Sequence, residues 1–405
     1  MTAADTQPDI EARRLKRAAL ATGVVFALSG TNAGTWASRI PAVRDQVDAS
    51  TGQLGLAVLA MAVGSLLVMP VTGRATQRWS SRTVVLVTAL TCMAMLAVIP
   101  YAPGVLALAA ILLVYGAGFG SWDVAMNVHG HAVEQRAGRA WMPRYHAAWS
   151  AGGVIGAGIG ALAAAAGLPL AVHFGLVALI ASAVLLVVLR LFVDDRPAVW
   201  QPDGGDDHAP AKRGRLLSTH LALLGLITIC ATFTEGAAVD WLALMLADTR
   251  DLAQSVAAVG YAVFASAMMI GRFVGTPTIA RLGRAGAVRL GGFAALVGVV
   301  LAVLGPGLVS ALIGCALWGL GVALTFPAAM SAAGDTPGRS ADAIAAVSTI
   351  GYGGFLLGPP IIGYAAEAIG LDRALLIVGL LASGIVVLSP ALRERSSATA
   401  DTTPP

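Results

Sequence analysis

Three acidic residues, Asp123, Glu235 and Asp240, lie inside long apolar stretches of the 405-residue sequence. A carboxylate in hydrocarbon is costly unless it faces protein or water, so such residues mark functional positions in membrane proteins. The sequence places no Lys or Arg near the middle of these stretches, and an acid without a cation favours its protonated form when it leaves water. The three acids are therefore candidates for proton uptake and release. The alternative is a structural acid that is neutralised by a helix end or a neighbouring amide.

Polar and aromatic residues recur at helical spacing in the same stretches. Ser29, Asn32, Trp36 and Arg39 share one helical stripe, as Asp123 does with Asn127. Amide groups donate and accept hydrogen bonds, and indole rings stack on the C–H face of a sugar ring. The candidate binding residues for a polar organic ligand are Ser29, Asn32, Trp36, Asn127, Trp241 and Tyr352. Helix packing and the Trp belts of membrane interfaces are the alternative explanations.

Histidines occur at two positions of interest. His146 begins one apolar stretch at the depth where Asp123 lies in the preceding one, so His146 is a candidate proton relay. His129, His131 and Glu134 form the pattern His-x-His-x-x-Glu, which favours a solvated helix end over a metal site at this position. We expect no metal and no cofactor.

The composition excludes several classes of protein. Hydrophobic residues make up 57% of the chain and charged residues 12%, whereas soluble domains carry about 25% charged residues. This balance excludes a soluble enzyme, a disordered chain and a nucleic-acid-binding protein. No set of nucleophile, base and orienting residue indicates an enzyme. The three cysteines each lie in an apolar run and are interpreted as small buried side chains.

Twelve apolar segments are long enough to cross a bilayer, which takes about 20 helical residues. They predict an all-α membrane protein with twelve transmembrane helices in two six-helix bundles. The predicted spans are Ala18 to Ser38, Gln53 to Gly73, Thr83 to Pro100, Gly104 to Met126, Pro143 to Ala166, Leu168 to Phe192, Leu216 to Leu246, Gln254 to Val274, Gly286 to Leu304, Gly307 to Met330, Ala341 to Ala366 and Asp372 to Leu392.

The Lys and Arg residues predict the orientation of these spans. Of the 26 basic residues, 22 fall in the termini and alternate loops on one side, and four fall on the other. By the positive-inside rule, both termini are cytoplasmic. The acidic segment 194–215 is the predicted linker between an N-terminal bundle (1–193) and a C-terminal bundle (216–405). Gly118 and Gly160 match Gly321 and Gly363 at one fixed offset, which favours an internal duplication.

Three motifs carry a family resemblance. They read Gly118-Phe-Gly-Ser-Trp-Asp123-Val-Ala-Met-Asn127, Glu235-Gly-Ala-Ala-Val-Asp240-Trp241-Leu, and Gly271-Arg272-Phe continuing to Arg281-Leu-Gly-Arg284. On these motifs the chain resembles the major facilitator superfamily over essentially its whole length. Its details are similar to the bacterial branch that contains the fucose:proton symporter. The resemblance implies two parallel six-helix repeats around a midplane site.

One departure from the superfamily concerns the loop after the second span. Gly73 is followed by Arg74, Ala75 and Thr76 without the usual Asp, and the second copy has Thr276 where that branch usually has Asp. Acids that would latch neighbouring helix ends are thus missing twice. The candidate gating residues are Arg39, Arg74, Arg78, Arg82, Arg144, Arg272 and Arg281, and contact with phospholipid phosphates is the alternative role of the loop arginines.

The resemblance and the buried acids together predict a secondary active transporter. We expect it to move a small polar solute, such as a sugar or a sugar-like metabolite, together with protons across the bacterial cytoplasmic (inner) membrane. Proton-driven efflux of an amphipathic metabolite or drug is the first alternative, and a membrane sensor that has lost transport is the second. The expected partners are the solute, protons and membrane lipid, with no nucleic acid, and the expected state is a monomer.

Overall fold

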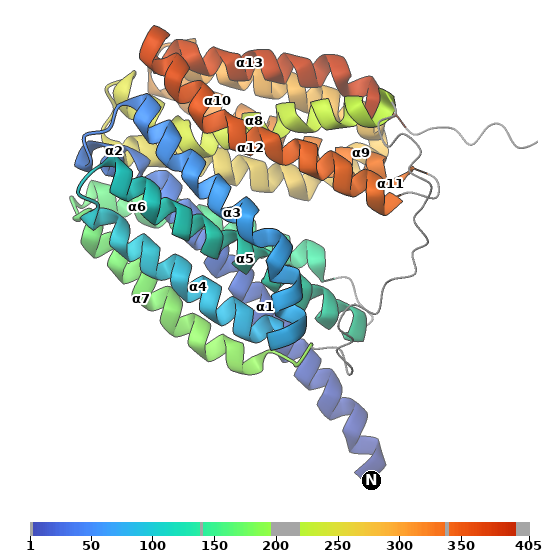
Figure 1. Ribbon diagram of the computed structural model, residues 1–405. Coiled ribbons are helices and arrows are strands. Elements are labelled where there is room, and N and C mark those ends of the chain that lie inside the picture. The colour runs from blue at the N-terminus through green and yellow to red at the C-terminus, as the bar shows by residue number, and fades with distance from the viewer. Residues whose placement is uncertain (1–2, 138–140, 196–218, 337–339, 394–405) are drawn as a thin grey trace, which may run out of the picture.

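The computed structural model describes residues 3–137, 141–195, 219–336 and 340–393, and all regular structure in these ranges is helical (Figure 1). The first half comprises α1 (Ala3–Ser38), α2 (Ile40–Gln46), α3 (Thr51–Trp79), α4 (Ser81–Val98), α5 (Val105–Ala137), α6 (Met142–Ala165) and α7 (Leu170–Val188), with short 3₁₀ turns η1 (Ile99–Tyr101) and η2 (Leu189–Leu191). The second half comprises α8 (Thr219–Asp248), α9 (Gln254–Leu304), α10 (Gly307–Val322), α11 (Thr325–Gly334), α12 (Ser340–Ile369), α13 (Leu371–Leu388) and η3 (Ser389–Leu392).

Eleven segments of the described chain are long and apolar enough to cross a membrane. Five lie in the first half and six in the second half. The 36-residue α1 is not among the eleven, although it is the sixth long helix of the first half. The helix α9 contains two of these spans, because Gly283 adopts a left-handed φ of 68° and breaks the helix there. The ninth span follows this break and its helix begins again at Arg284, close to the Gly286 that the sequence predicted.

The helices pack as two bundles (Figure 1). In the first bundle α1 packs on α6, α5 on α3 and α4, and α7 on α4. In the second bundle α9 packs on α10 and α13, and α8 on α12 and α13. The bundles meet where α6 contacts α9 and α3 contacts α12. The predicted linker, 194–215, falls almost entirely outside the described residues.

Small residues allow close backbone contact within a bundle. A Cβ added at Gly152 of α6 would lie 2.0 Å from the Ala27 carbonyl oxygen of α1. One added at Gly116 of α5 would lie 1.9 Å from the Met61 carbonyl oxygen of α3. Both glycines are thus required for helix contact, which is the packing explanation that the sequence left open for such stripes.

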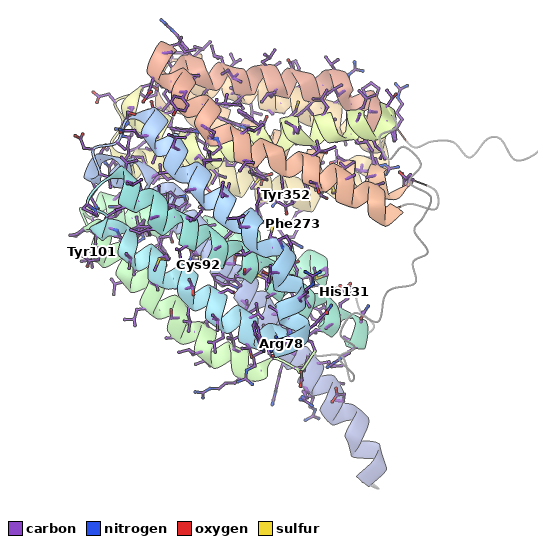
Figure 2. The ribbon with its side chains drawn as sticks, viewed as in Figure 1. Arg78, Cys92, Tyr101, His131, Phe273 and Tyr352 are labelled. Atoms are coloured by element: carbon purple, nitrogen blue, oxygen red, sulfur yellow. The ribbon has the colours of Figure 1, made fainter. Side chains whose placement is uncertain are left out.

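The molecule has two ends, which we call the α2 end and the linker end. The α2 end contains α2 and the turns after α4, α6, α8, α9 and α12, and Figure 2 shows Tyr101 there. The linker end contains the turns after α3 and α5, the residues flanking 196–218, and the break at Gly283. Arg78 and His131 lie at this second end (Figure 2). Each transmembrane helix runs between the two ends, so a site at mid-helix lies at mid-membrane depth.

Candidate functional site

A cavity of about 340 Å³ lies between the two bundles. Seven helices line it: α1, α3, α5 and α6 from the first bundle, and α8, α9 and α12 from the second. Its lining residues are Ala33, Trp36, Val58, Met61, Ala62, Ser65, Leu66, Met69, Tyr115, Phe119, Gly120, Asp123, Trp149, Glu235, Gly236, Val239, Asp240, Tyr261, Tyr352, Phe355, Leu356 and Pro359. Because both bundles contribute walls, any rocking of one bundle against the other changes the shape and exposure of this cavity.

The three acids predicted from the sequence converge on the cavity. Asp123 comes from α5, whereas Glu235 and Asp240 come from α8. The side chain of Asn127 donates to the Asp123 carboxylate at 3.3 Å and to the Asp123 backbone carbonyl at 2.8 Å. Asp240 is only 8% exposed, and within the described residues it has no hydrogen bond or ion pair. Asp240 is thus the acid with the fewest interactions that favour its charged form.

Glu235 is paired with a cation, contrary to the sequence-based expectation that no Lys or Arg reaches mid-depth. The Arg272 guanidinium lies 3.3 Å from Glu235 Oε1 and 3.5 Å from the Ser150 hydroxyl of α6. Arg272 is near the end of its span, but its long side chain reaches back along the helix to the acid, as Arg side chains do in membranes. Arg272 therefore connects the two bundles through α6 and α9.

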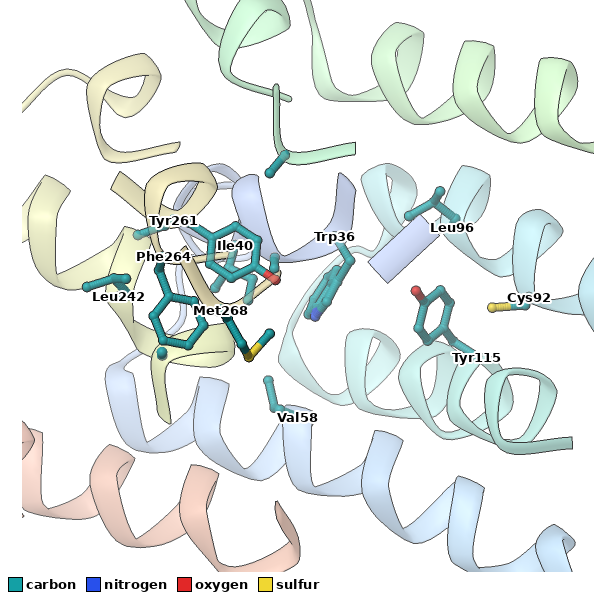
Figure 3. Close-up of a cluster of buried hydrophobic side chains, with 14 of the residues drawn as sticks. Trp36, Ile40, Val58, Cys92, Leu96, Tyr115, Leu242, Tyr261, Phe264 and Met268 are labelled. Carbon is teal, nitrogen blue, oxygen red and sulfur yellow. The ribbon is translucent and has the colours of Figure 1, made fainter. Parts of the chain in front are cut away.

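Aromatic side chains form much of the cavity wall. Trp36 of α1 lies between Tyr115 of α5 on one side and Tyr261 and Phe264 of α9 on the other (Figure 3). The Trp36 and Tyr115 rings are 6.4 Å apart between centroids. Tyr352 of α12, which is 38% exposed, lies between the two bundles in Figure 2. The cavity thus combines aromatic faces with carboxylate oxygens.

Four of the predicted binding residues do not line the cavity. Ser29, Asn32 and Trp241 are fully buried among packed helices, and Asn127 interacts with its own helix. The Asn32 carbonyl accepts a hydrogen bond from Tyr115, and its amide nitrogen lies 3.2 Å from the Met93 sulfur. Asn32 thus positions Tyr115, a residue of the cavity wall, from within the first bundle.

Other lining residues were not among the sequence-based candidates. Ser65 of α3 donates to the Gly116 carbonyl at 2.7 Å and lies on a stripe with Met61 and Met69, four residues to either side. This regular spacing was present in the sequence and marks the α3 face of the cavity. Trp149 and Tyr261 also line the cavity. Neither stood in a motif that distinguished it from ordinary packing.

His146 is exposed and lies against Phe26, with the two ring centroids 5.4 Å apart at an interplanar angle of 78°. No contact between His146 and Asp123 occurs among the described residues. His129 lies elsewhere, fully buried, with its ring stacked on Phe192 and its Nδ1 atom 3.4 Å from Asp195. The predicted relay between His146 and Asp123 therefore has no direct contact in this conformation.

The seven arginines predicted as gates fall into two groups, five that are exposed and two that are interior. Arg74, Arg78, Arg82, Arg144 and Arg281 are exposed near the linker end, and none forms an ion pair with another described residue. Two of these five lie over tryptophan rings, those of Trp79 and Trp141, at 5.4 and 4.9 Å. The other two arginines are interior. Arg39 is 5% exposed and donates to the Leu168 carbonyl at 3.3 Å within the first bundle, whereas Arg272 bridges the bundles.

Polar contacts between the bundles are concentrated at the α2 end. Arg44 pairs with Asp248, and the Gln254 amide donates to Asp45 at 3.1 Å. Burial disfavours the Arg44 cation, but its bonds to Asp248 and Asp45 outweigh burial and raise the pKa of Arg44.

A second set of contacts at the α2 end joins α3 to α12. Glu367 accepts from the Gly52 backbone amide at 3.2 Å and from the Ser50 hydroxyl. A Cβ at Gly55 would lie only 2.5 Å from the Pro359 carbonyl oxygen. The two sets of contacts close the α2 end of the cavity.

Two bundles of membrane-spanning helices that share a central cavity with acids at mid-depth define a secondary transporter of the alternating-access class. The profile of the Major Facilitator Superfamily matches residues 22–359. The chain is 35% identical to transporter y4wD of Sinorhizobium fredii over 91% of this chain and 96% of that one. It is 30% identical to membrane protein MosC of Rhizobium meliloti over 89% of this chain and 86% of that one. The chain therefore belongs to the major facilitator superfamily, is a multi-pass membrane protein and is not an enzyme.

Solved structures share the fold at low sequence identity. The chain aligns with a variant of the nucleoside transporter NupG at a TM-score of 0.75 and 14% identity, over 92% of this chain and 98% of that one. It aligns with the Escherichia coli fucose:proton symporter FucP at a TM-score of 0.62 and 16% identity, over 93% and 98%. At such identities these structures establish the fold alone.

Proposed function

We propose that this transporter couples proton movement to the transport of a small organic solute with a sugar-like mixture of polar and apolar faces. One observation carries the proposal. Three carboxylates and several aromatic rings from both bundles converge on a single cavity. Carboxylate oxygens accept hydrogen bonds from hydroxyl groups, and aromatic faces cover the C–H side of a ring. The three acids, with no basic residue among the described lining, disfavour an anionic solute.

Proton coupling is assigned first to Asp240 and Asp123. Neither is paired with a cation among the described residues, so each exchanges a proton at the lowest electrostatic cost when the cavity opens to water. Glu235 has a different role, because Arg272 compensates its charge at 3.3 Å. Protonation of Glu235, or a solute that displaces it, releases Arg272 and weakens a link between the bundles. Proton or solute occupancy and bundle movement are connected in this way.

The proposed orientation places the linker end in the cytoplasm. The exposed arginines near this end are five of the predicted gating residues, and cytoplasmic loops carry an excess of Lys and Arg. The α2 end then faces outward and is closed by the bonds of Arg44 and Glu367. A protein in this state exchanges solute with the cytoplasm.

Export of an amphipathic solute is the second candidate. It is favoured by the large apolar share of the cavity wall, which includes Val58, Met61, Met69, Phe119 and Leu356. A fully polar solute gains little from these side chains, whereas a solute with an apolar face buries them. The two candidates differ in the direction of proton movement: the proton moves with the solute in the first and against it in the second.

Transport by purified protein in proteoliposomes tests both candidates. The solutes are radiolabelled neutral sugars, sugar acids and amphipathic amines, each measured with and without an imposed pH gradient. We expect accumulation of a neutral solute with the proton flux and no accumulation of sugar acids. Glu235→Gln is expected to weaken accumulation while preserving exchange. Amine movement against the proton flux indicates export instead, and preferred uptake of sugar acids contradicts the charge argument.

A further inference from the structure

A second cavity, of about 370 Å³, lies at the linker end of the second bundle. It is separate from the transport cavity, since the two share no lining residue. We call it the basic pocket, and it is lined by Leu282, Gly283, Arg284, Ala285, Gly286, Arg289, Ser389, Pro390 and Arg393. The residues come from the break in α9, from η3 and from the residue after η3.

Three arginines and no acid contribute to the lining of the basic pocket. Arg284 is 8% exposed and is positioned by Asp335, to which it is ion-paired, and by the Ser331 hydroxyl, to which it donates at 3.0 Å. Arg289 and Arg393 are exposed and form no ion pair with other described residues. The pocket thus presents two guanidinium groups that are available for an anion beside a third that is held in place. Guanidinium groups bind phosphate oxygens through paired hydrogen bonds.

The backbone of the pocket adds to this preference. At Gly283 the chain adopts φ 68° and ψ 165°, so the helical hydrogen-bond ladder is interrupted and a helix begins again with Arg284. The amides of a first helical turn have no carbonyl partner one turn earlier, and the helix dipole favours an anion there. Ala285 and Gly286 of this turn line the pocket together with the arginines.

Apolar side chains continue from the pocket along the outside of the bundle. Phe293, four residues after Arg289 on the same face of α9, is 57% exposed, and its neighbour Leu290 is also 57% exposed. On α13, Val387 lies three residues before Pro390 and is 73% exposed. These residues belong to membrane-spanning segments, so their exposed surfaces face hydrocarbon. A ligand in the pocket therefore lies where a polar head group meets acyl chains.

We propose that the basic pocket binds the phosphate group of an anionic phospholipid, whose acyl chains lie along Leu290, Phe293 and Val387. Basic pockets between transmembrane helices are suited to anionic head groups. A soluble phosphate ester gains the same arginines but leaves the apolar surface uncovered, so the lipid is the favoured source of the phosphate. The bound lipid spans the break in α9 and joins it to η3.

Native mass spectrometry of the purified full-length protein tests this proposal. The protein is titrated with phosphatidylglycerol or phosphatidylcholine of identical acyl chains, and lipid adducts are counted. We expect a phosphatidylglycerol adduct that the double variant Arg289→Gln/Arg393→Gln weakens by about tenfold or more, because each basic residue contributes on the order of fivefold to binding of an anionic lipid. The matched control is Arg136→Gln/Arg190→Gln, which removes two exposed arginines at the same end of the first bundle. The control should retain the adduct.

Three results would overturn the proposal. If phosphatidylcholine binds as well as phosphatidylglycerol, the net negative charge of the lipid does not determine binding. If both double variants lose the lipid adduct equally, this pocket is not the binding site. Displacement of the lipid by millimolar inorganic phosphate or glycerol phosphate indicates a soluble ligand as the source. A wild-type protein crosslinked to a photoactivatable phosphatidylglycerol provides a test that does not depend on the variants folding. The crosslinks should map to residues 282–293 and 387–393, and crosslinks confined to other helices contradict the assignment.

Discussion

The two ends of the molecule hold their bundles in different ways. At the α2 end, Arg44 with Asp248 and Glu367 with Gly52 join one bundle to the other. At the linker end, the polar contacts among described residues lie within a single bundle, as in the pairs Asp195 with Ser81 and Arg284 with Asp335. Arg272 lies between the two ends and also joins the bundles, since it contacts Ser150 across the interface at 3.5 Å.

This difference indicates which contacts must change during transport. Bonds within a bundle survive when the bundles rock, whereas bonds between bundles must break at one end and form at the other. The α2 end is therefore the closed gate of this conformation. The contacts of the linker end keep each bundle rigid while it moves. Closing the linker end requires loss of the contacts made by Arg44 and Glu367.

The largest effect is expected from a steric block at the α2 end. In Gly55→Leu, the new side chain meets the Pro359 carbonyl oxygen, which lies 2.5 Å from an added Cβ. Overpacking costs about 1–3 kcal/mol, which shifts the equilibrium towards the state with an open α2 end by about 5–150-fold. Spin-label distances across both ends measure the shift. The control is Gly158→Leu on α6, where a Cβ meets nothing within 4 Å, and an equal shift in that variant contradicts this account.

A smaller effect is expected from the Arg44 and Asp248 pair. Their side chains are 20% and 30% exposed, and ion pairs near the surface contribute about 0.2–1 kcal/mol. Arg44→Asp should thus move the same equilibrium by no more than about fivefold. The double variant Arg44→Asp/Asp248→Arg should restore it, because the opposite charges are again paired. If the double variant does not restore the wild-type spin-label distances, the Arg44 and Asp248 pair does not hold the gate closed.

The smallest effect is expected from Asp195, which ties the chain after α7 to the first bundle. Its carboxylate accepts from the Ser81 amide at 3.1 Å. Burial disfavours the charged form of Asp195, but the His129 ring and Ser81 outweigh burial and lower its pKa. A lowered pKa in the folded state contributes stability above the ordinary Asp value, and this contribution is lost as pH falls through the folded pKa.

Asp195→Asn should therefore lower the free energy of unfolding by about 1 kcal/mol at neutral pH. The difference from wild type should shrink below about pH 4. Denaturation in detergent at several pH values measures it, with Asp251→Asn at the exposed α2 end as the control. No conformational shift towards either open state is expected, because this contact lies within one bundle. A difference that grows on acidification contradicts the assignment.

Much of the fold was predictable because hydrophobic length determines a membrane span. The break in α9 at Gly283 lies in the predicted gap between the spans Gln254 to Val274 and Gly286 to Leu304, because Gly and Arg interrupt the apolar sequence there. The short helix α2, with buried Ile40 and Val43, was not predicted because seven residues give little periodicity. The missing information for α2 is the tertiary contact that buries Ile40 and Val43.

The candidate site was predictable in part. Asp123, Glu235 and Asp240 stood out because ionisable residues are rare in hydrocarbon. Asn32 and Trp241 were placed at the ligand because amide and indole groups suit a polar organic solute, but both pack within a bundle. Polarity in a membrane helix marks a face that avoids lipid, and that face contacts either the cavity or the neighbouring helices. Spacing along one helix does not distinguish the two.

Proton coupling by acids that lack a cation is the central feature of the proposed mechanism. The decisive measurement is solute accumulation by Asp123→Asn/Asp240→Asn in proteoliposomes under an inward gradient of about one pH unit. Such a gradient supplies about 1.4 kcal/mol per proton, or about tenfold accumulation for each proton coupled. We predict that wild type and the exposed control Asp48→Asn concentrate the solute, while the double variant only equilibrates it and still exchanges labelled for unlabelled solute. Gradient-driven accumulation by the folded double variant would contradict the account.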